Sequence, residues 1–561
     1  MRQANRRLRL LVAVFAIVFV AAFARVAWLQ AVKAQTLDHL ATSQHRDELT
    51  VPARRGTIFD RNGVQLAFGL GGTTVSANPK QVVDPRETAI AVGEALDLDP
   101  GKLYPLLTDR SRGFVYLARK ADPEKAQVLE AQEIVGLGFR PEERRVYPQR
   151  TVASEIVGYA GTDNTGLSGL ELQLDEELAG HEGSKTIVRD PFGRTIDVVD
   201  ADQVQNGRDV VLTVDHTIQG YVERVLRRTK ARWGAQSATA VVLDPRTGGI
   251  LALAIEPGFD ANAFPAVART DEERLRNRAV TDTYEPGSTF KVVTVGGVLE
   301  DNIVSPGTKF RLKYKIPVAD RIIHDALPRG TQTMTVSQIL SRSSNVGVVT
   351  LAQQLQREGI NKWIRRFGFG RKTGVDFPGE SRGIVLRPEE WSGSTIGNVP
   401  IGQGIAVTPL QMAAAYGAIA NDGVWLQPHL VDRVEGSDRV EAESRQVLSE
   451  GTTRELTRML RGVVEEGSGT TAQVEGYRVA GKTGTAAKPE PTGGYSDTRY
   501  VASFVGFAPA SRPRVVILVT VDEPRGAIWG GTVAGPVFAE IAQFVLQYLE
   551  VPPDARNDDG E

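Results

Sequence analysis

The chain has 561 residues, 41% of them hydrophobic and 24% charged, which is the composition of an ordinary globular protein with two or more folding units. Its formal net charge of -2 argues against nucleic acid as a partner. The absence of cysteine excludes thiol nucleophiles, disulfides and thiolate metal sites, so a catalytic nucleophile must be a hydroxyl, an amine or a carboxylate.

Residues 1–30 have the pattern of a cytoplasmic tip followed by a single transmembrane helix. Four arginines come first: Arg2, Arg6, Arg7 and Arg9. An apolar run follows from Leu10 to Ala24 and resumes up to Leu29, about twenty residues in all, enough to cross a hydrocarbon layer of about 30 Å. Because arginines stay on the cytoplasmic side, we expect a single-pass protein of the cell membrane with its N-terminus inside and the rest of the chain outside.

A cleaved signal peptide is the alternative for the same segment. Ala22-Phe23-Ala24 has the small-x-small pattern of a cleavage site after a short apolar core. Both interpretations export every residue after residue 30, so they place the remaining chain in the same compartment.

Residues 50–215 predict a mixed α/β domain, because short strand-like runs, turns and charged stretches alternate without one long periodic segment. Asp60-Arg61-Asn62-Gly63 lies between strand-like residues 57–59 and 64–66. An Asn-Gly pair at this place predicts a hairpin turn in which both central residues have positive φ. We interpret this turn as structural.

Residues 235–551 predict a second domain, of the α+β class. Its strand-like runs form an early pair and a late pair: 238–243, 250–255, 500–507 and 514–521. Residues 537–549 follow Gly535-Pro536 with the apolar spacing of a helix. Early strands, a helical middle, late strands and a closing helix indicate an antiparallel sheet covered by helices. We expect the acidic tail at 552–561 to be disordered.

Two capping boxes predict helix starts in the helical middle. Thr335 with Gln338 has the capping-box spacing, and Thr408 with Gln411 repeats it with Pro409 at the first helical position. We therefore expect one helix after each of these threonines.

Ser288 and Lys291 are candidate catalytic residues in the segment Glu285-Pro286-Gly287-Ser288-Thr289-Phe290-Lys291. Pro and Gly break the incoming chain, and a helix can start after Ser288, so both side chains share one face. We expect Lys291 to reach the Ser288 hydroxyl. A neutral Lys291 could take the serine proton if burial and a second cation lower its pKa. Taken alone, Ser-x-x-Lys is a weak signal.

Ser343-Ser344-Asn345 follows the helix expected after Thr335, where a loop between helices can present a hydroxyl and an amide. Ser343 is a candidate proton relay, and Asn345 is a candidate ligand for a substrate amide. A polar helix cap is the alternative interpretation of the same residues.

Lys482-Thr483-Gly484-Thr485 predicts an exposed edge strand in an alternating stretch. Such a strand can pair with a peptide, with Gly484 allowing close approach, Lys482 adding positive charge and Thr483 or Thr485 donating to a carboxylate. Residues 476–483 also fit a phosphate-binding loop. However, Gly484 and Pro489 argue against the helix that must follow such a loop.

The three motifs, in this order, are the signature shared by penicillin-binding proteins and serine β-lactamases. The chain resembles the class B penicillin-binding proteins over nearly its whole length. Residues 55–63, which include Arg-Gly at the start and Asp-Arg-Asn-Gly at the end, and residues 166–171 are similar to landmarks of their non-catalytic domain. Glu285-Pro286-Gly287 and residues 401–404 are similar to the division-type members, with the elongation-type members close behind.

The resemblance implies the fold of the penicillin-recognising serine transpeptidases and β-lactamases, preceded by a membrane helix and a mixed α/β pedestal or dimerisation-type domain. It also implies a serine-type D-Ala-D-Ala transpeptidase. Ser288 would attack the carbonyl between the last two D-alanines of a stem peptide. An amine of a neighbouring stem peptide would then resolve the acyl-enzyme.

The resemblance assigns further roles to the remaining motif residues. Lys291 would be the general base, Ser343 and Lys482 the relay to the leaving amine, and Asn345 the anchor of the donor amide. The backbone amides of the nucleophile and of Thr485 would form the oxyanion hole. Either lysine is compatible with the role of base. We expect no cofactor and no metal, because the six histidines lack metal-ligand spacing.

The resemblance also implies partners and a cellular setting. The expected ligands are stem peptides and β-lactams, and the expected protein partners are a polytopic membrane glycosyltransferase and other division proteins. The implied setting is septal cell-wall synthesis. The alternatives are an elongation-specific class B enzyme, a β-lactamase, and an acylated sensor or scaffold related to the β-lactamases.

Overall fold

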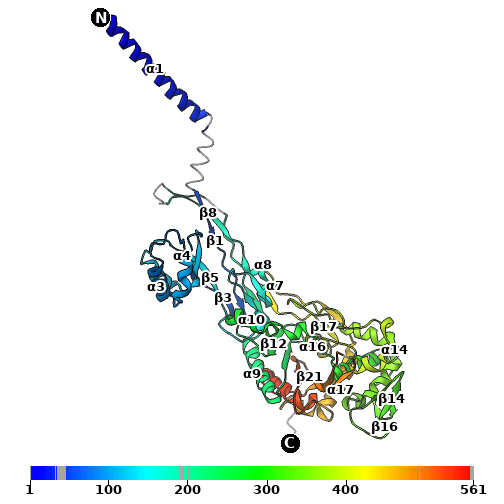
Figure 1. Cartoon of the computed structure of the whole chain (residues 1–561). Coiled ribbons are helices and arrows are strands. Elements are labelled where there is room, and N and C mark those ends of the chain that lie inside the picture. The colour runs from blue at the N-terminus through cyan, green and yellow to red at the C-terminus, as the bar shows by residue number, and fades with distance from the viewer. Residues whose placement is uncertain are drawn as a thin grey trace. The chain divides into compact units, whose positions relative to one another are not determined.

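The computed structural model describes residues 2–31, 33, 46–189, 195–199, 202–491 and 493–555 (Figure 1). Internal contacts divide the chain into two compact units, Met1–Arg54 with Gly180–Gly207 and Arg55–Ala179 with Arg208–Glu561. The expectation of a disordered tail at 552–561 falls mainly on residues 556–561, which lie outside the described residues.

The first unit contains one long helix and a small antiparallel sheet. Helix α1 (Arg2–Ala31) is long and apolar enough over Asn5–Ala31 to cross a membrane, which confirms the predicted apolar helix. The guanidinium of Arg25 lies 5.0 Å from the centre of the Trp28 ring, so the one charge within the apolar run has an aromatic partner. The sheet has the order β1-β8-β9: β1 (Arg46–Val51), β8 (Gly183–Arg189) and β9 (Thr195–Val199).

In the second unit, the residues before 180 are arranged around the long strand β3 (Gln65–Ala77). It pairs antiparallel with three strands: β2 (Ile58–Phe59), β4 (Val115–Ala121) and β5 (Leu137–Val146). Three helices pack against this sheet: α3 (Pro85–Leu96), α4 (Pro100–Thr108) and α5 (Pro123–Glu130). Each helix begins with an aspartate cap followed by proline, which explains where it starts.

The predicted hairpin at Asp60–Gly63 is present, but its turn geometry differs from the prediction. Only Gly63 of the two central residues has positive φ, at 84°. The Asp60 carboxylate accepts hydrogen bonds from the backbone N–H groups of Asn62 and Val64, both at 2.8 Å. Because the aspartate organises the turn, Asn62 has no need of a left-handed backbone conformation.

A buried ion-pair network connects the two landmark segments of the predicted non-catalytic domain. Glu171, in helix α7 (Gly169–Gln173), is fully buried and accepts from Arg55 Nε at 2.7 Å and from Arg145 Nε at 2.6 Å. Arg55 also bonds Asp175 at 2.6 Å. Since these charges are shielded from water, each depends on the others for compensation.

A five-stranded antiparallel sheet forms the centre of the remaining residues, in the order β12-β11-β22-β21-β20. Its strands are β11 (Ser237–Leu243), β12 (Ile250–Glu256), β20 (Ala480–Pro489), β21 (Tyr495–Ala508) and β22 (Val515–Asp522). Both predicted strand pairs are confirmed. The early and late strands meet where β11 pairs with β22, and β20 lies at the edge of the sheet.

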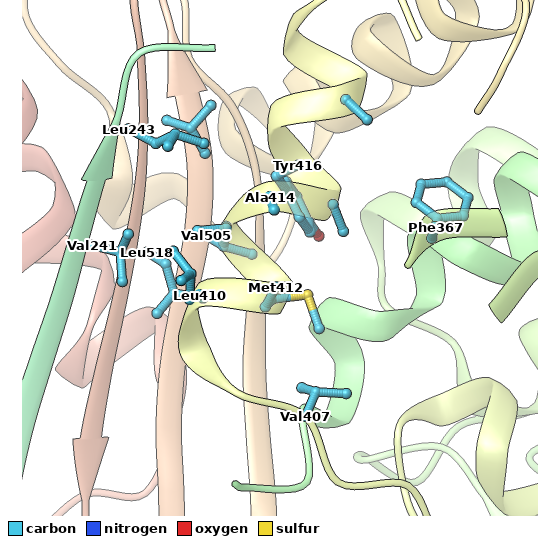
Figure 2. Close-up of a cluster of buried hydrophobic side chains, with 14 of the residues drawn as sticks. Val241, Leu243, Phe367, Val407, Leu410, Met412, Ala414, Tyr416, Val505 and Leu518 are labelled. Carbon is cyan, nitrogen blue, oxygen red and sulfur yellow. The ribbon is translucent and has the colours of Figure 1, made fainter. Parts of the chain in front are cut away.

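Helices cover both faces of this sheet, as predicted. Helix α16 (Pro409–Ala420) is buried on every side, and Figure 2 shows its Leu410 directed at the strands that carry Val505 and Leu518. Helices α9 (His216–Trp233) and α19 (Gly535–Tyr548), the latter being the predicted closing helix, pack on the alternate residues of the same strands.

The middle of the domain contains both predicted capping boxes. Thr335 Oγ1 accepts from Gln338 N at 3.1 Å and Thr408 Oγ1 accepts from Gln411 N at 3.0 Å. The main helices of this region are α12 (Lys291–Glu300), α13 (Val336–Ser341), α14 (Asn345–Phe367) and α17 (Glu450–Glu465).

The predicted helical middle also contains short strand pairs, which the sequence analysis did not predict. Strand β13 (Lys309–Leu312) pairs with β16 (Gln332–Thr335), and β14 (Lys315–Val318) pairs with β15 (Arg321–His324). Exposed and partly buried residues alternate along β13 and β14. Each strand therefore packs on the hydrophobic core through only one of its two faces.

The two regions predicted as residues 50–215 and 235–551 share a sheet. Strand β10 (Val210–Leu212) pairs in parallel with β2 and antiparallel with β18 (Val431–Val434). Backbone hydrogen bonds therefore connect the N-terminal part of the second unit to the domain that contains the three motifs.

We predict that Glu171→Ala unfolds the second unit more easily, because Arg55 and Arg145 would be left buried without a carboxylate. The free energy of unfolding should fall by about 3–5 kcal/mol. Thermal unfolding of the purified protein measures this. Asp163→Ala is the control, since its ion pair with Arg119 is formed by a side chain that is 79% exposed. Equal effects of the two substitutions would contradict the prediction.

Candidate active site

Ser288 lies in a single helical turn immediately before α12. This turn (Gly287–Phe290) continues into α12, so Ser288 and Lys291 share one helical face as predicted. Gly287 has a φ of 55°, which favours glycine, and its N–H donates to Gly402 O at 3.0 Å. The Tyr416 hydroxyl of α16 donates to Thr289 O at 2.9 Å. The serine is thus held by segments on both sides, and it lines a cavity of about 720 Å³.

Lys291 is completely buried, and its amine points to the loop that contains Ser343. Nζ donates to Ser343 O at 2.6 Å, to Asn345 Oδ1 at 2.7 Å and to Ser343 Oγ at 3.1 Å. Among the hydrogen bonds of the described residues, none joins Lys291 to Ser288, so the predicted direct contact is replaced by contacts to this loop. Burial lowers the pKa of Lys291 well below 10.5, the positive charge of Lys482 lowers it further, and Asp325 opposes them.

The segment Ser343–Asn345 connects α13 to α14, as predicted. Ser344 caps α14 by accepting from Gly347 N at 3.0 Å, so the cap interpretation holds for Ser344, and all three residues line the cavity. Ser343 has a φ of 57°, a strained conformation for a serine. Such strain persists only where the surrounding contacts fix the loop.

Asp325 supplies those contacts. Its buried carboxylate accepts from Ser344 Oγ and from Val346 N, both at 3.0 Å. Arg329 Nε donates to the same carboxylate at 2.7 Å, which neutralises it. Asn345 Nδ2 donates to His324 O at 3.0 Å, so the end of β15 is bonded to this loop as well.

Lys482-Thr483-Gly484-Thr485 occupies the edge strand β20, but the expectation that it is exposed is wrong for two of its side chains. Lys482 is completely buried, and Thr483 is 7% exposed. Burial lowers the pKa of Lys482 to about 7. Thr483 Oγ1 hydrogen-bonds Ser468 Oγ at 2.8 Å, and Thr485 Oγ1 accepts from Gly530 N at 3.0 Å. The strand that follows Lys482 also excludes a phosphate-binding loop, which needs a helix there.

Gly484 is needed because the strand lies directly against the turn that carries Ser288. A Cβ at Gly484 would lie 2.9 Å from both Pro286 O and Thr289 Cγ2, and it would collide with Ser503 Oγ. The close approach predicted for a substrate is therefore, in this structure, an approach between two parts of the protein.

The structure brings the three motifs together around one cavity. Its lining includes five of the predicted site residues: Ser288, Ser343, Asn345, Thr483 and Thr485. Lys291 and Lys482 are buried beside them, and Gly484 joins the strand to the serine turn. The sequence analysis missed other lining residues: Arg329, Arg342, Gln403, Ser468 and Trp529. Except for Gln403, which lies in the segment 401–404, they belong to no short motif, and only the fold places them here.

One histidine is part of a cluster that has the ligand types of a metal site. Asp60, Asp215 and His216 have ligand atoms within 4.8 Å of one another. Asp215 caps α9 and accepts from Asn62, while Asp60 accepts from the turn and bonds His216 Nδ1 at 2.7 Å. These oxygens are occupied by structural hydrogen bonds, so we interpret the cluster as structural. His39 and His45 lie outside the described residues.

Comparison with known families identifies both parts of the chain. Residues 238–543 match the penicillin-binding protein transpeptidase domain, and residues 50–212 match the penicillin-binding protein dimerisation domain. The chain therefore belongs to the class B penicillin-binding proteins, which are peptidoglycan D,D-transpeptidases.

Individual relatives cover nearly the whole chain. Stage V sporulation protein D of Bacillus subtilis is 35% identical over 551 residues, which span 96% of this chain and 85% of the relative. Peptidoglycan D,D-transpeptidase FtsI of Escherichia coli is 32% identical, over 95% of this chain and 90% of the relative. The structure of penicillin-binding protein 3 from Mycobacterium tuberculosis in complex with ampicillin has a TM-score of 0.73 at 32% identity, covering 91% of this chain and 98% of that one.

We predict that Gly484→Ala slows acylation of the protein by penicillin about a hundredfold or more, because the added Cβ forces β20 away from the serine turn. Stopped-flow acylation kinetics measure the effect. Gly462→Ala is the control: it lies in α17 of the same domain, and a Cβ there meets no atom within 4 Å. Wild-type kinetics in Gly484→Ala would show that the close approach is dispensable.

Proposed function

We propose that this protein is a septal peptidoglycan D,D-transpeptidase in which Ser288 is acylated by stem peptides and by β-lactams. The observation that carries the proposal is the convergence of Ser288, two buried lysines and the Ser343–Asn345 loop on one cavity. The ampicillin complex of the Mycobacterium tuberculosis protein, with the same fold, supports β-lactam binding.

Lys291 is the general base in this proposal. A neutral lysine amine has two N–H groups and one lone pair. Two acceptors that cannot donate, Ser343 O and Asn345 Oδ1, fix the N–H groups at 2.6 and 2.7 Å. In the neutral amine the Ser343 hydroxyl, 3.1 Å away, donates to the lone pair, and the Ser288 hydroxyl takes its place when the proton is transferred. Burial and the charge of Lys482, which lower the pKa of Lys291, keep the lone pair available.

The remaining motif residues complete the reaction. As Ser288 Oγ attacks the donor carbonyl, its proton passes to Lys291, and the backbone amides of Ser288 and Thr485 stabilise the oxyanion. Ser343 and Lys482 deliver a proton to the leaving D-alanine amine. Asn345 orients the donor amide, while Thr483, Gly484 and Thr485 provide the strand beside which the donor lies.

Two segments at the serine turn support the septal role. Glu285-Pro286-Gly287 and residues 401–404 carry the similarity to division-type members, and they contact each other. Gly287 N donates to Gly402 O at 3.0 Å, and Gly404 N donates to Glu285 Oε1 at 2.9 Å. The sporulation relative favours a second candidate, synthesis of the spore wall by the same reaction.

The membrane setting completes the proposal. Helix α1 anchors the protein in the cell membrane, with its arginines in the cytoplasm and residues 50–551 outside. Residues 50–215 form a pedestal domain and 235–551 the transpeptidase domain. The proposed partners are a polytopic membrane glycosyltransferase, which supplies the glycan strand, and other division proteins.

We predict that a fluorescent penicillin forms a stable adduct on Ser288, located by peptide mapping, and that Ser288→Ala abolishes it. Lys291→Ala should slow adduct formation about a thousandfold, the usual effect of losing a general base. Lys309→Ala is the matched control, because this lysine is exposed on β13. Rapid turnover of the penicillin would instead indicate a β-lactamase.

The acylation rate should also depend on pH. The base must be neutral, so the rate is low below the pKa of Lys291, rises through it, and levels off well below pH 10.5, the ordinary lysine value. In Lys482→Gln the charge that lowers the pKa of Lys291 is removed, so any remaining activity should rise at a higher pH than in wild type. A rate that climbs up to pH 10 in wild type would contradict the role of Lys291.

We further predict that bacteria depleted of this protein elongate without forming septa. Wild-type protein should restore division, and Ser288→Ala should fail, because cross-linking requires the nucleophile. Cell length and the position of a fluorescent fusion measure this. Rounded cells would indicate an elongation role, a defect confined to spores would indicate the second candidate, and rescue by Ser288→Ala would indicate a scaffold.

A further inference from the structure

The cavity at Ser288 extends well beyond the motif residues. On one flank lies β20, with Thr483 and Thr485. Another part of the lining comes from β15, β16 and the segments beside them, and its residues are Ile322, Leu327, Arg329, Gln332, Met334 and Arg342. A donor peptide that lies along β20 leaves this part of the lining, which we call the far flank, open to a second molecule.

Arg342 is the free charge of the far flank. It ends α13 as its C-cap, one residue before Ser343, so the helix fixes its backbone. Its guanidinium donates to the neutral Gln332 Oε1 at 3.3 Å. Arg329, by contrast, is bonded to Asp325 at 2.7 Å. Among the ion pairs of the described residues, Arg342 takes part in none, so it can accept the carboxylate of a ligand.

The electrostatics of the cavity favour an anionic ligand over a cationic one. Its lining has two arginines, Arg329 and Arg342, and one acidic residue, Asp325, which Arg329 already neutralises. A protonated amine would therefore be repelled. A molecule that carries a neutral amine and a carboxylate would be attracted, and the exposed side chains of Ile322 (62%) and Leu327 (71%) give apolar contact to the chain between them.

We propose that the far flank binds the acceptor stem peptide, and that Arg342 pairs with a carboxylate of this peptide while its amine reaches the acyl group on Ser288. The inference rests on the proposed function. In the transfer step the amine nitrogen attacks the acyl carbon, the bond from that carbon to Ser288 Oγ breaks, and an amide forms. One amine proton returns to Ser288 Oγ through Lys291. Arg342 takes no part in these bonds and acts as a specificity-determining residue.

The test compares two acceptors that differ only in charge. The full-length protein is acylated with an activated thioester donor and offered a synthetic stem peptide with a free side-chain amine, either as the free acid or with its carboxylates amidated. The ratio of peptide transfer to hydrolysis is measured by mass spectrometry. Because both products come from the same acyl-enzyme, this ratio does not depend on how fast that acyl-enzyme forms.

We expect Arg342→Gln to lower the transfer ratio about fivefold for the free acid, the effect of losing a solvent-accessible ion pair, and to leave the ratio for the amidated acceptor within about twofold. Arg342→Lys should keep most of the preference because it keeps the charge. Raising the salt concentration should weaken the preference in wild type.

Arg311→Gln is the matched control, since this exposed arginine of β13 does not line the cavity. If Arg342→Gln lowered the transfer ratio equally for both acceptors, or for neither, the assignment of Arg342 would be overturned. Failure of wild-type protein to form any acyl-enzyme would be a different result, because it would refute the proposed function itself.

Discussion

The rest of the site depends on the burial of two lysines without a carboxylate of their own. The amines of Lys291 and Lys482 contact only neutral groups of the loop at 343–345 and of Ser468 and Thr483. Burying an ammonium in this way is costly, so both pKa values fall. The fold compensates for this cost because Lys291 begins the almost fully buried helix α12 and Lys482 lies in a strand of the central sheet. The result is an amine that can act as a base well below pH 10.5.

The same constraint explains why the neighbouring acid is sequestered. Asp325 would stabilise the charged form of Lys291 if it were free, and it does oppose the lowering of that pKa. Its carboxylate is instead occupied by Arg329, Ser344 and the N–H of Val346. One side chain thus fixes the Ser343–Asn345 loop in its strained conformation while its own charge is largely cancelled. The contacts of Asp325 therefore both position the Ser343–Asn345 loop and limit the effect of its charge on the pKa of Lys291.

The sequence predicts those features that local rules control. Capping boxes, the strand pairs of the central sheet and the residues of the three motifs follow from spacing and propensity. Contacts between distant segments were not predictable in this way. Ser468 meets Thr483 through a turn that has no motif, Asp325 meets Ser344 across 19 residues, and the strands β13 to β16 depend on the helices beneath them. The sequence predicts Gly484 as a close-approach residue, but its neighbour in the structure is the serine turn.

Around the serine, four segments make three close contacts through backbone rather than through side chains. A Cβ at Gly402 would collide with Gly287, one at Gly530 would collide with the carbonyl of Gly484, and one at Gly484 would meet Pro286. Substitutions that lower β-lactam binding are therefore not expected at these glycines, because a side chain there would also impair cell-wall synthesis. Tolerated changes should instead collect at the rim of the cavity, where Trp529 exposes its side chain and can vary without moving the nucleophile.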